Sequence, residues 1–139
     1  PIYQVVTADG PDVGVYSTVL PQGAAVVMLS TVDYANIDPG VPAAFSAKVV
    51  GVLRDTAGFD GVVTCDDLSA ADQVAEFSPG ERATRAVDAG VDLLLVSADP
   101  SVYPEMRDAV LARAQSDPAF AAKVDAAATR ILAQKASMP

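Results

Sequence analysis

Short apolar runs alternate with helix-like segments along most of the chain. Residues 25–31, 61–65 and 91–97 are apolar runs of strand length, and runs of this length predict buried strands. The segments between them carry apolar residues at helical spacing. The pattern therefore predicts consecutive βα units with a parallel sheet and right-handed crossovers. Before them, residues 2–6 predict a short strand or an extended connection, and residues 12–20 predict one to two turns of helix.

Capping residues predict where the helices begin and end. Serine or an Asp-Pro pair opens each helical segment, once as a Ser-x-x-Glu capping box, and glycine closes two of the segments. The predicted helices begin at Ser46, Ser78, Ser101 and Asp117, and the first two end at Gly58 and Gly90. The last helix carries an apolar stripe that predicts core packing, made of Phe120, Val124, Ala127, Ala128 and Ile131.

Composition narrows the class of protein. The chain has 139 residues, enough for one domain with a core, and no apolar run reaches the roughly 18 residues of a membrane span. The formal net charge is −9 and the basic residues are scattered, which argues against nucleic acid as a partner. The chain has no His and a single Cys, Cys65, so we expect no disulfide, no metal site and no cofactor. Because Cys65 lies in a predicted strand, we expect an inert core thiol.

Two adjacent carboxylates, Asp66 and Asp67, follow the second predicted strand. The C-terminal end of a buried parallel strand is where α/β enzymes place catalytic groups. Burying a carboxylate there is costly unless it is paired or used in chemistry. Side chains alternate along a strand, so these two acids are expected to point to opposite sides. One of them is the leading candidate for catalysis. The other is expected to bond backbone amides of the next loop or a basic residue on a neighbouring helix.

The segment around these acids, GFDGVVTCDDL at residues 58–68, resembles the nucleophile segment of glycoside hydrolase family 3, in particular its β-N-acetylhexosaminidase branch. The similarity extends to residues 27–32, 38–46, 52–54 and 85–96, and it covers roughly residues 23–135. In that family the segment closes one strand of a (β/α)8 TIM-type barrel. A whole barrel takes about 250 residues. The resemblance therefore implies that residues 1–139 are a single partial domain, the last three or so βα units of a barrel, with parallel strands and incomplete as a lone chain.

The same resemblance implies a retaining glycosidase that releases terminal β-linked N-acetylglucosamine from a glycan or cell-wall fragment. Asp66 would be the nucleophile that forms a covalent glycosyl-enzyme, and Asp67 would be structural. The family's acid/base is a His on an upstream loop. This chain has no His, so we expect it to be inactive alone. The upstream half of the barrel or another copy of the chain is expected to complete it. A bacterial source is implied, in the cell envelope, outside the cell or in the cytoplasm.

Other interpretations stay open. The two acids also fit a non-catalytic or degenerate α/β binding module with an acidic Asp66/Asp67 site. Such a site would bind Mg²⁺ if Asp33 and Asp99 converge on it. The chain further fits a small independent open α/β sandwich, or a half-barrel that only dimerises. It begins at Pro1 without an initiator Met, so we expect a processed or partial product.

Several positions near the predicted site bear on its chemistry. Asp33, Tyr34 and Asp38 follow the first predicted strand and are expected either to rim the site or to cap their own loop. Thr31 stands where the family often has His, and Ala70 stands where it tends to have Met. These two departures favour an altered pocket but leave the nucleophile in place.

Overall fold

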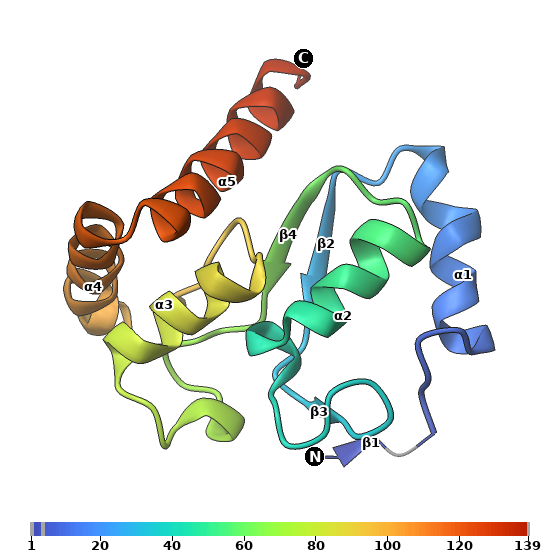
Figure 1. Cartoon of the computed structure of the whole chain (residues 1–139), viewed down its shortest axis with the longest axis horizontal. Helices are drawn as coiled ribbons and strands as arrows, with labels where there is room; N and C mark the ends of the chain where they lie inside the picture. Colours follow the sequence, from blue (N-terminus) through green and yellow to red (C-terminus); the bar gives the residue numbers. More distant parts are fainter. Residues whose placement is uncertain (1, 4, 139) are drawn as a thin grey trace.

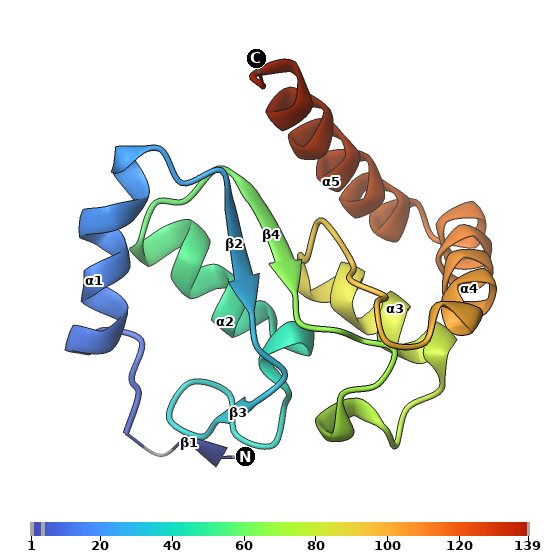
Figure 2. The same cartoon turned by 180° about the vertical axis from the view of Figure 1, so that it is seen from behind.

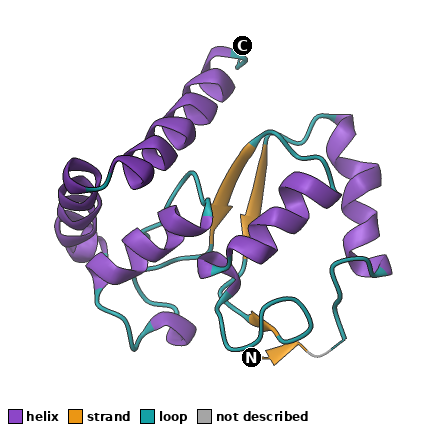
Figure 3. Cartoon of the chain, in the orientation of Figure 1, coloured by secondary structure: helices purple, strands orange, loops and turns teal. Residues whose placement is uncertain are grey.

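A parallel pair of strands, β2 (Val26–Leu29) and β4 (Val62–Cys65), lies at the centre of the fold (Figure 1). This computed structural model describes residues 2–3 and 5–138. Helices occupy most of the periphery (Figure 3). With 3₁₀ and π turns labelled η, the order is β1 (Ile2–Tyr3), α1 (Pro11–Val19), η1 (Leu20–Gln22), β2, β3 (Asp33–Tyr34), η2 (Ala43–Phe45), α2 (Ala47–Gly51), η3 (Val52–Thr56), β4, η4 (Asp72–Val74), α3 (Pro79–Ala89), η5 (Pro100–Val102), α4 (Tyr103–Ser116) and α5 (Pro118–Ala136).

The first two predicted strands are confirmed, and the third is wrong as a regular strand. Residues 91–97 run beside β4 in the parallel direction, but only Thr64 and Leu93 form a bridge. The carboxylate of Asp92 accepts the N–H of Val63 at 2.9 Å, and the carbonyl of Val63 accepts the N–H groups of both Asp92 and Leu93. A side chain thus takes the donor that a backbone carbonyl would use in a parallel ladder, and the ladder is interrupted.

The N-terminal region adds a small parallel pair. Within residues 2–6 a strand forms at Ile2–Tyr3, and Gln4 lies outside the described residues. This strand, β1, pairs with β3, which the sequence pattern did not indicate, so that Ile2 is opposite Asp33. The predicted helix over residues 12–20 is confirmed as α1.

The predicted helix starts at Ser46, Ser78 and Asp117 are confirmed. The predicted start at Ser101 is wrong, because Ser101 lies inside the turn η5, which Asp99 caps, and α4 begins only at Tyr103. Ser78 Oγ accepts the N–H of Glu81 at 3.3 Å and the Glu81 carboxylate accepts the N–H of Ser78 at 2.9 Å, which completes the capping box of α3. Gly90 ends α3 with a φ of +103°, a conformation that favours glycine. Asp117 caps α5 through its carboxylate. The helix capped by Ser46 is α2, and it continues as the π-helical stretch η3.

The core lies on one side of the sheet, against α2 and α3. Val63, Cys65 and Leu68 are fully buried within it. Burial raises the pKa of the Cys65 thiol to about 11, in agreement with the expected inert core thiol. Within the described part of the chain, no helix combines the length and the apolar character needed to span a membrane.

The opposite face of the sheet is bare. Figure 2 shows β2 and β4 with no helix in front of them, whereas α2 lies over the strands in Figure 1. Large apolar side chains on or beside the strands are 40–60% exposed: Val26, Met28, Leu93 and Leu95. Parallel sheets are normally covered on both faces, so this face lacks a covering layer in the chain as described.

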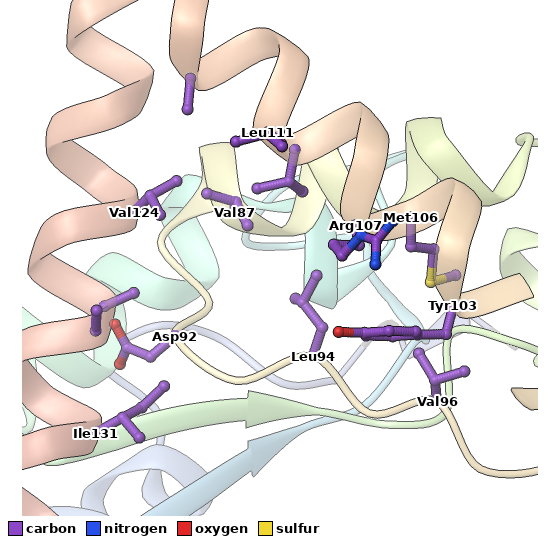
Figure 4. Close-up of a pocket in the computed structure, with 14 residues that line it drawn as sticks. Val87, Asp92, Leu94, Val96, Tyr103, Met106, Arg107, Leu111, Val124 and Ile131 are labelled. Atoms are coloured by element: carbon purple, nitrogen blue, oxygen red, sulfur yellow. The ribbon is translucent and has the colours of Figure 1, made fainter.

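Two apolar grooves flank the edges of the sheet. One, of about 560 Å³, lies between residues 92–96 and the helices α4 and α5, and Figure 4 shows Leu94, Val96 and Ile131 among the side chains that line it. The other, of about 200 Å³, is lined by residues of α1, β2 and α2, including Tyr16 and Leu29. Both edges of the sheet therefore adjoin apolar surface that the chain itself leaves open.

The apolar stripe of α5 is only partly a core surface. Phe120 and Ala127 are buried as predicted. Ala128 is exposed, and Val124 and Ile131 line the larger groove instead. The helical spacing correctly identified one face of α5, but most of that face has no covering segment among the described residues.

Candidate active site

The backbone fixes Asp66 at the C-terminal end of the strand pair. The N–H of Asp66 donates to the carbonyl of Leu29 at 2.8 Å, so the ladder between β2 and β4 continues one residue past Cys65. Side chains alternate along strands, and Met28 is opposite Thr64. The next residue on that same, bare face is Asp66, one residue past the end of β4. The register thus directs Asp66 toward the uncovered side of the sheet.

One oxygen of the Asp66 carboxylate is held and the other is available. Oδ1 accepts the N–H of Asp67 at 2.8 Å. Oδ2 accepts no hydrogen bond from the part of the chain that the structure describes, and no Lys or Arg there pairs with Asp66. The side chain is partly buried. A carboxylate in this state is oriented at one oxygen and able to contact a ligand with the other.

Asp67 has a different role, as the sequence predicts for the second acid. Its Oδ1 accepts the N–H of Ser69 at 2.8 Å, the hydroxyl of Ser69 at 2.6 Å and the N–H of Ser97 at 3.2 Å, and its Oδ2 accepts the N–H of Ala98 at 2.7 Å. The carboxylate therefore joins the loop after β4 to the turn that follows residues 91–97. Burial raises the pKa of Asp67, but the bonds from Ser69, Ala98 and Ser97 outweigh it and lower the pKa to about 2.

The Asp67 interaction should make stability depend on pH in the acid range. The folded-state pKa of Asp67, about 2, lies below its ordinary value of 3.8, so the folded state binds the proton less tightly than the unfolded state. The stabilisation is present above the ordinary pKa and is lost as pH falls through about 2. We expect the difference in free energy of unfolding between wild type and Asp67→Asn to shrink as pH falls from neutral toward 2. Urea unfolding at several pH values measures this difference, and a pH-independent difference would contradict it.

Arg82 supports the same loop from α3. Its guanidinium donates to the carbonyls of Leu68 at 2.9 Å, Ser69 at 3.1 Å and Phe77 at 2.8 Å. Of the two alternatives expected for the second acid, bonds to backbone amides of the next loop or to a basic residue on a neighbouring helix, Asp67 has the first. Arg82 binds loop carbonyls instead of the acid. The only sequence feature that could have indicated this role is the position of Arg82 in the first turn of the helix that follows the loop.

Of the three residues expected either to rim the site or to cap their own loop, Asp33 and Asp38 make local bonds. The carboxylate of Asp38 accepts the Lys48 ammonium at 2.7 Å and the Ser46 hydroxyl at 2.8 Å; both bonds lower the pKa of Asp38, and the acid braces the start of α2. Asp33 Oδ2 accepts the N–H of Gly40 at 2.8 Å, whereas its Oδ1 is buried and has no partner among the described residues. Tyr34 remains near the site, because its hydroxyl lies 3.4 Å from that of Ser30, just past β2.

Thr31, the first departure from the family pattern, is almost fully buried. Its hydroxyl donates to Oε1 of Gln73 at 3.1 Å and so links the loop after β2 to the loop after β4. This residue therefore joins two loops. The second departure, Ala70, is exposed.

The carboxylates considered for Mg²⁺ have separate local partners. Asp99 accepts the N–H and the hydroxyl of Ser101 and caps the turn before α4. Across residues 2–3 and 5–138, no three or more His, Cys, Asp or Glu side chains are grouped to hold a metal ion. The arrangement of these acids thus adds no support to the interpretation as a Mg²⁺-binding module.

A buried ionic cluster at the other end of the strands was missed by sequence reasoning. Asp92, 1% exposed at its side chain, accepts the guanidinium of Arg54 at 2.7 Å and that of Arg130 at 3.0 Å, besides the N–H of Val63. Arg54 also donates to the carbonyls before β4. The cluster ties η3, β4 and α5 together at the end opposite Asp66. The cluster stabilises the fold. The only sequence feature that could have indicated it is an Asp at the start of an apolar run.

Comparison with known proteins places the chain in a family. Residues 9–134 match the model of the glycosyl hydrolase family 3 N terminal domain. The chain belongs to this family. The resemblance carried by residues 58–68 is thereby confirmed.

Relatives within glycoside hydrolase family 3 include enzymes named for N-acetylhexosaminide cleavage. The crystal structure of a β-N-acetylhexosaminidase from Beutenbergia cavernae matches 97% of this chain with a TM-score of 0.94 and 53% identity, and the match covers 40% of that protein. A family 3 β-N-acetylglucosaminidase from Paenibacillus matches 86% of the chain at 32% identity, with a TM-score of 0.77 and 23% of its own length covered. A β-hexosaminidase from Thioalkalivibrio sulfidiphilus is 39% identical over 89 residues, which are 63% of this chain and 25% of the relative.

The family 3 chain thus spans about a quarter of this curated relative and two fifths of the Beutenbergia structure. Its mixed α/β architecture with parallel strands corresponds to one part of a family 3 barrel domain.

Proposed function

We propose that this chain carries the nucleophile of a retaining β-N-acetylhexosaminidase, and that Asp66 is that nucleophile. The observation that carries the proposal is the state of its carboxylate, anchored at Oδ1 and open at Oδ2 at the C-terminal end of a parallel strand. In the reaction Oδ2 attacks the anomeric carbon as the glycosidic bond breaks, and the leaving oxygen takes a proton from a general acid. Water then cleaves the ester between the sugar and Asp66.

The proposed substrate is a glycan or cell-wall fragment that ends in β-linked N-acetylglucosamine. Support comes from the family and from the activity for which the Beutenbergia relative, 53% identical, is named. A neutral sugar is compatible with a net charge of −9 because its recognition needs no basic surface.

The proposed general acid belongs to barrel units outside this chain. Retaining hydrolysis needs a group that protonates the leaving oxygen, and the His expected from the family resemblance is absent because the chain contains no His. We therefore propose that residues 1–139 form one partial domain, the last three or so βα units of the barrel, and are inactive without the rest.

The upstream barrel units are the proposed completing partner, in preference to a second copy of the chain. In the Beutenbergia relative the region similar to this chain is 40% of one polypeptide. The bare face, the two grooves and the unpaired backbone N–H groups of Leu94 and Val96, which donate to nothing among the described residues, are surfaces that strands of such units would cover. A second copy would bring the same bare face and no His.

The isolated 139-residue chain is expected to self-associate, because its bare face and edges are apolar. Sedimentation velocity over a range of concentrations measures this. Met28→Lys places a charge on the bare face and is expected to reduce association. Leu132→Lys, equally exposed but outside both grooves, is the matched control and should associate as wild type does. A wild-type chain that stays a monomer and unfolds in one cooperative transition would contradict the partial-barrel proposal.

A further inference from the structure

We infer that Asp67 and Ser69 are positioning residues that aim the Asp66 carboxylate and make Oδ2 the attacking oxygen. The inference rests on the proposed function of Asp66. The Asp66 carboxylate is oriented by one hydrogen bond, of 2.8 Å, from the backbone N–H of Asp67 to Oδ1 of Asp66. No side-chain substitution other than proline removes a backbone donor. The orientation of Asp66 therefore depends on whatever fixes the main chain at residue 67.

The side chain of Asp67 fixes that main chain from two directions. Its carboxylate accepts bonds from Ser69 in its own loop and from the N–H groups of Ser97 and Ala98, thirty residues further along. Hydrogen bonds to an ionised acceptor are roughly twice as strong as neutral ones. The nucleophile loop is in this way held to the end of the neighbouring extended segment.

Ser69 links the Asp67 carboxylate to the turn at residues 97–99. Its buried hydroxyl donates to Oδ1 of Asp67 at 2.6 Å and accepts the N–H of Asp99 at 3.0 Å. The hydroxyl thus transmits the position of the turn at residues 97–99 to the Asp67 carboxylate. Loss of the hydroxyl would leave the N–H of Asp99 unsatisfied in a partly buried place, so the turn would move relative to Asp66.

A displaced Asp66 should lose rate more than it loses substrate affinity. A nucleophile must lie within a narrow range of distance and angle, and a misplacement of about 1 Å can cost about 100-fold in rate. Neither Asp67 nor Ser69 is proposed to touch the sugar. Their substitution is therefore expected to lower kcat while KM changes little.

The inference is tested in the intact protein, that is, this chain together with the proposed upstream barrel units. The measurement is steady-state kinetics on an aryl N-acetylglucosaminide. Asp67→Asn is expected to lower kcat about 100-fold with KM within a few-fold, and Ser69→Ala about 10-fold. Ser69→Thr keeps the hydroxyl and should recover most of the rate. Asp88→Asn is the control, because Asp88 also bonds basic side chains but lies on α3 away from the loop. Unchanged kcat in Asp67→Asn, or a raised KM alone, would overturn the inference.

Hydrogen exchange of the Asp67 amide separates this inference from the proposed function. The wild-type amide should be protected by Asp66, and Asp67→Asn and Ser69→Ala should make it exchange at least several-fold faster, whereas Asp88→Asn should not. If the wild type hydrolyses no aryl N-acetylglucosaminide, the proposed function fails while this measurement still tests the positioning contact. Unchanged exchange in both loop variants would overturn the inference whatever the kinetics show.

Discussion

Asp66→Asn in the intact protein is expected to abolish turnover while the fold is kept. Asparagine has nearly the same shape, and its carbonyl oxygen can still accept the N–H of Asp67. A neutral amide is a poor nucleophile, so the covalent step fails. Removal of a nucleophile typically costs on the order of 10⁴-fold or more in kcat. Steady-state kinetics on an aryl N-acetylglucosaminide, with thermal unfolding beside it, measures both parts of this expectation.

A matched control for this substitution is available in the same loop. Asp72 is an exposed acid in η4, and Asp72→Asn makes the same change of charge without touching the strand end. We expect Asp72→Asn to turn over as wild type does. Normal turnover by Asp66→Asn, together with a dead Asp67→Asn, would show that the nucleophile has been assigned to the wrong acid.

Asp92→Asn is expected to lower the free energy of unfolding by about 3–5 kcal/mol, the usual cost of breaking a buried ion pair. The substitution leaves the guanidinium of Arg54, only 17% exposed, without its carboxylate, and it weakens the bond to the N–H of Val63. The link from Arg130 on α5 is lost as well. Urea unfolding of the chain, followed by circular dichroism, measures the change.

An exposed ion pair provides the comparison for Asp92. Asp108 pairs with Arg107 on the surface of α4, and both side chains are more than half exposed. Solvent-exposed pairs contribute little, so Asp108→Asn should change the free energy of unfolding by less than about 1 kcal/mol. Equal effects of the two substitutions would show that the Asp92 cluster is not a buried anchor.

Local patterns predicted those parts of the fold that depend on neighbouring residues. The apolar runs identified β2 and β4, and the Ser78 box and Asp117 marked the starts of α3 and α5 where the structure has them. Alternation along the strand also predicted different surroundings for Asp66 and Asp67, and their carboxylates do have different hydrogen-bond partners. These predictions succeeded because capping, alternation and strand length are decided within a few residues.

The features that were missed depend on residues far apart in the chain. Residues 91–97 are apolar enough for a strand, but the Asp92 side chain takes the backbone donor of Val63, which no local pattern reveals. The loop carbonyl that Arg82 binds, that of Leu68, was missed as well, because local patterns do not predict the path of a loop. The apolar stripe of α5 showed which face is apolar, but periodicity alone does not say which segment covers that face.

Covalent trapping is the sharpest test of Asp66 as the nucleophile. The intact protein is incubated with a fluorinated N-acetylglucosaminyl fluoride, which forms the glycosyl-enzyme faster than it is hydrolysed, and the product is followed by intact-mass and peptide mass spectrometry. We expect a mass increase of one fluorinated sugar, carried by the peptide that contains Asp66, and no adduct in Asp66→Asn. Absence of an adduct in the wild type, or an adduct mapped to any other residue, would contradict Asp66 as the nucleophile of a retaining glycosidase.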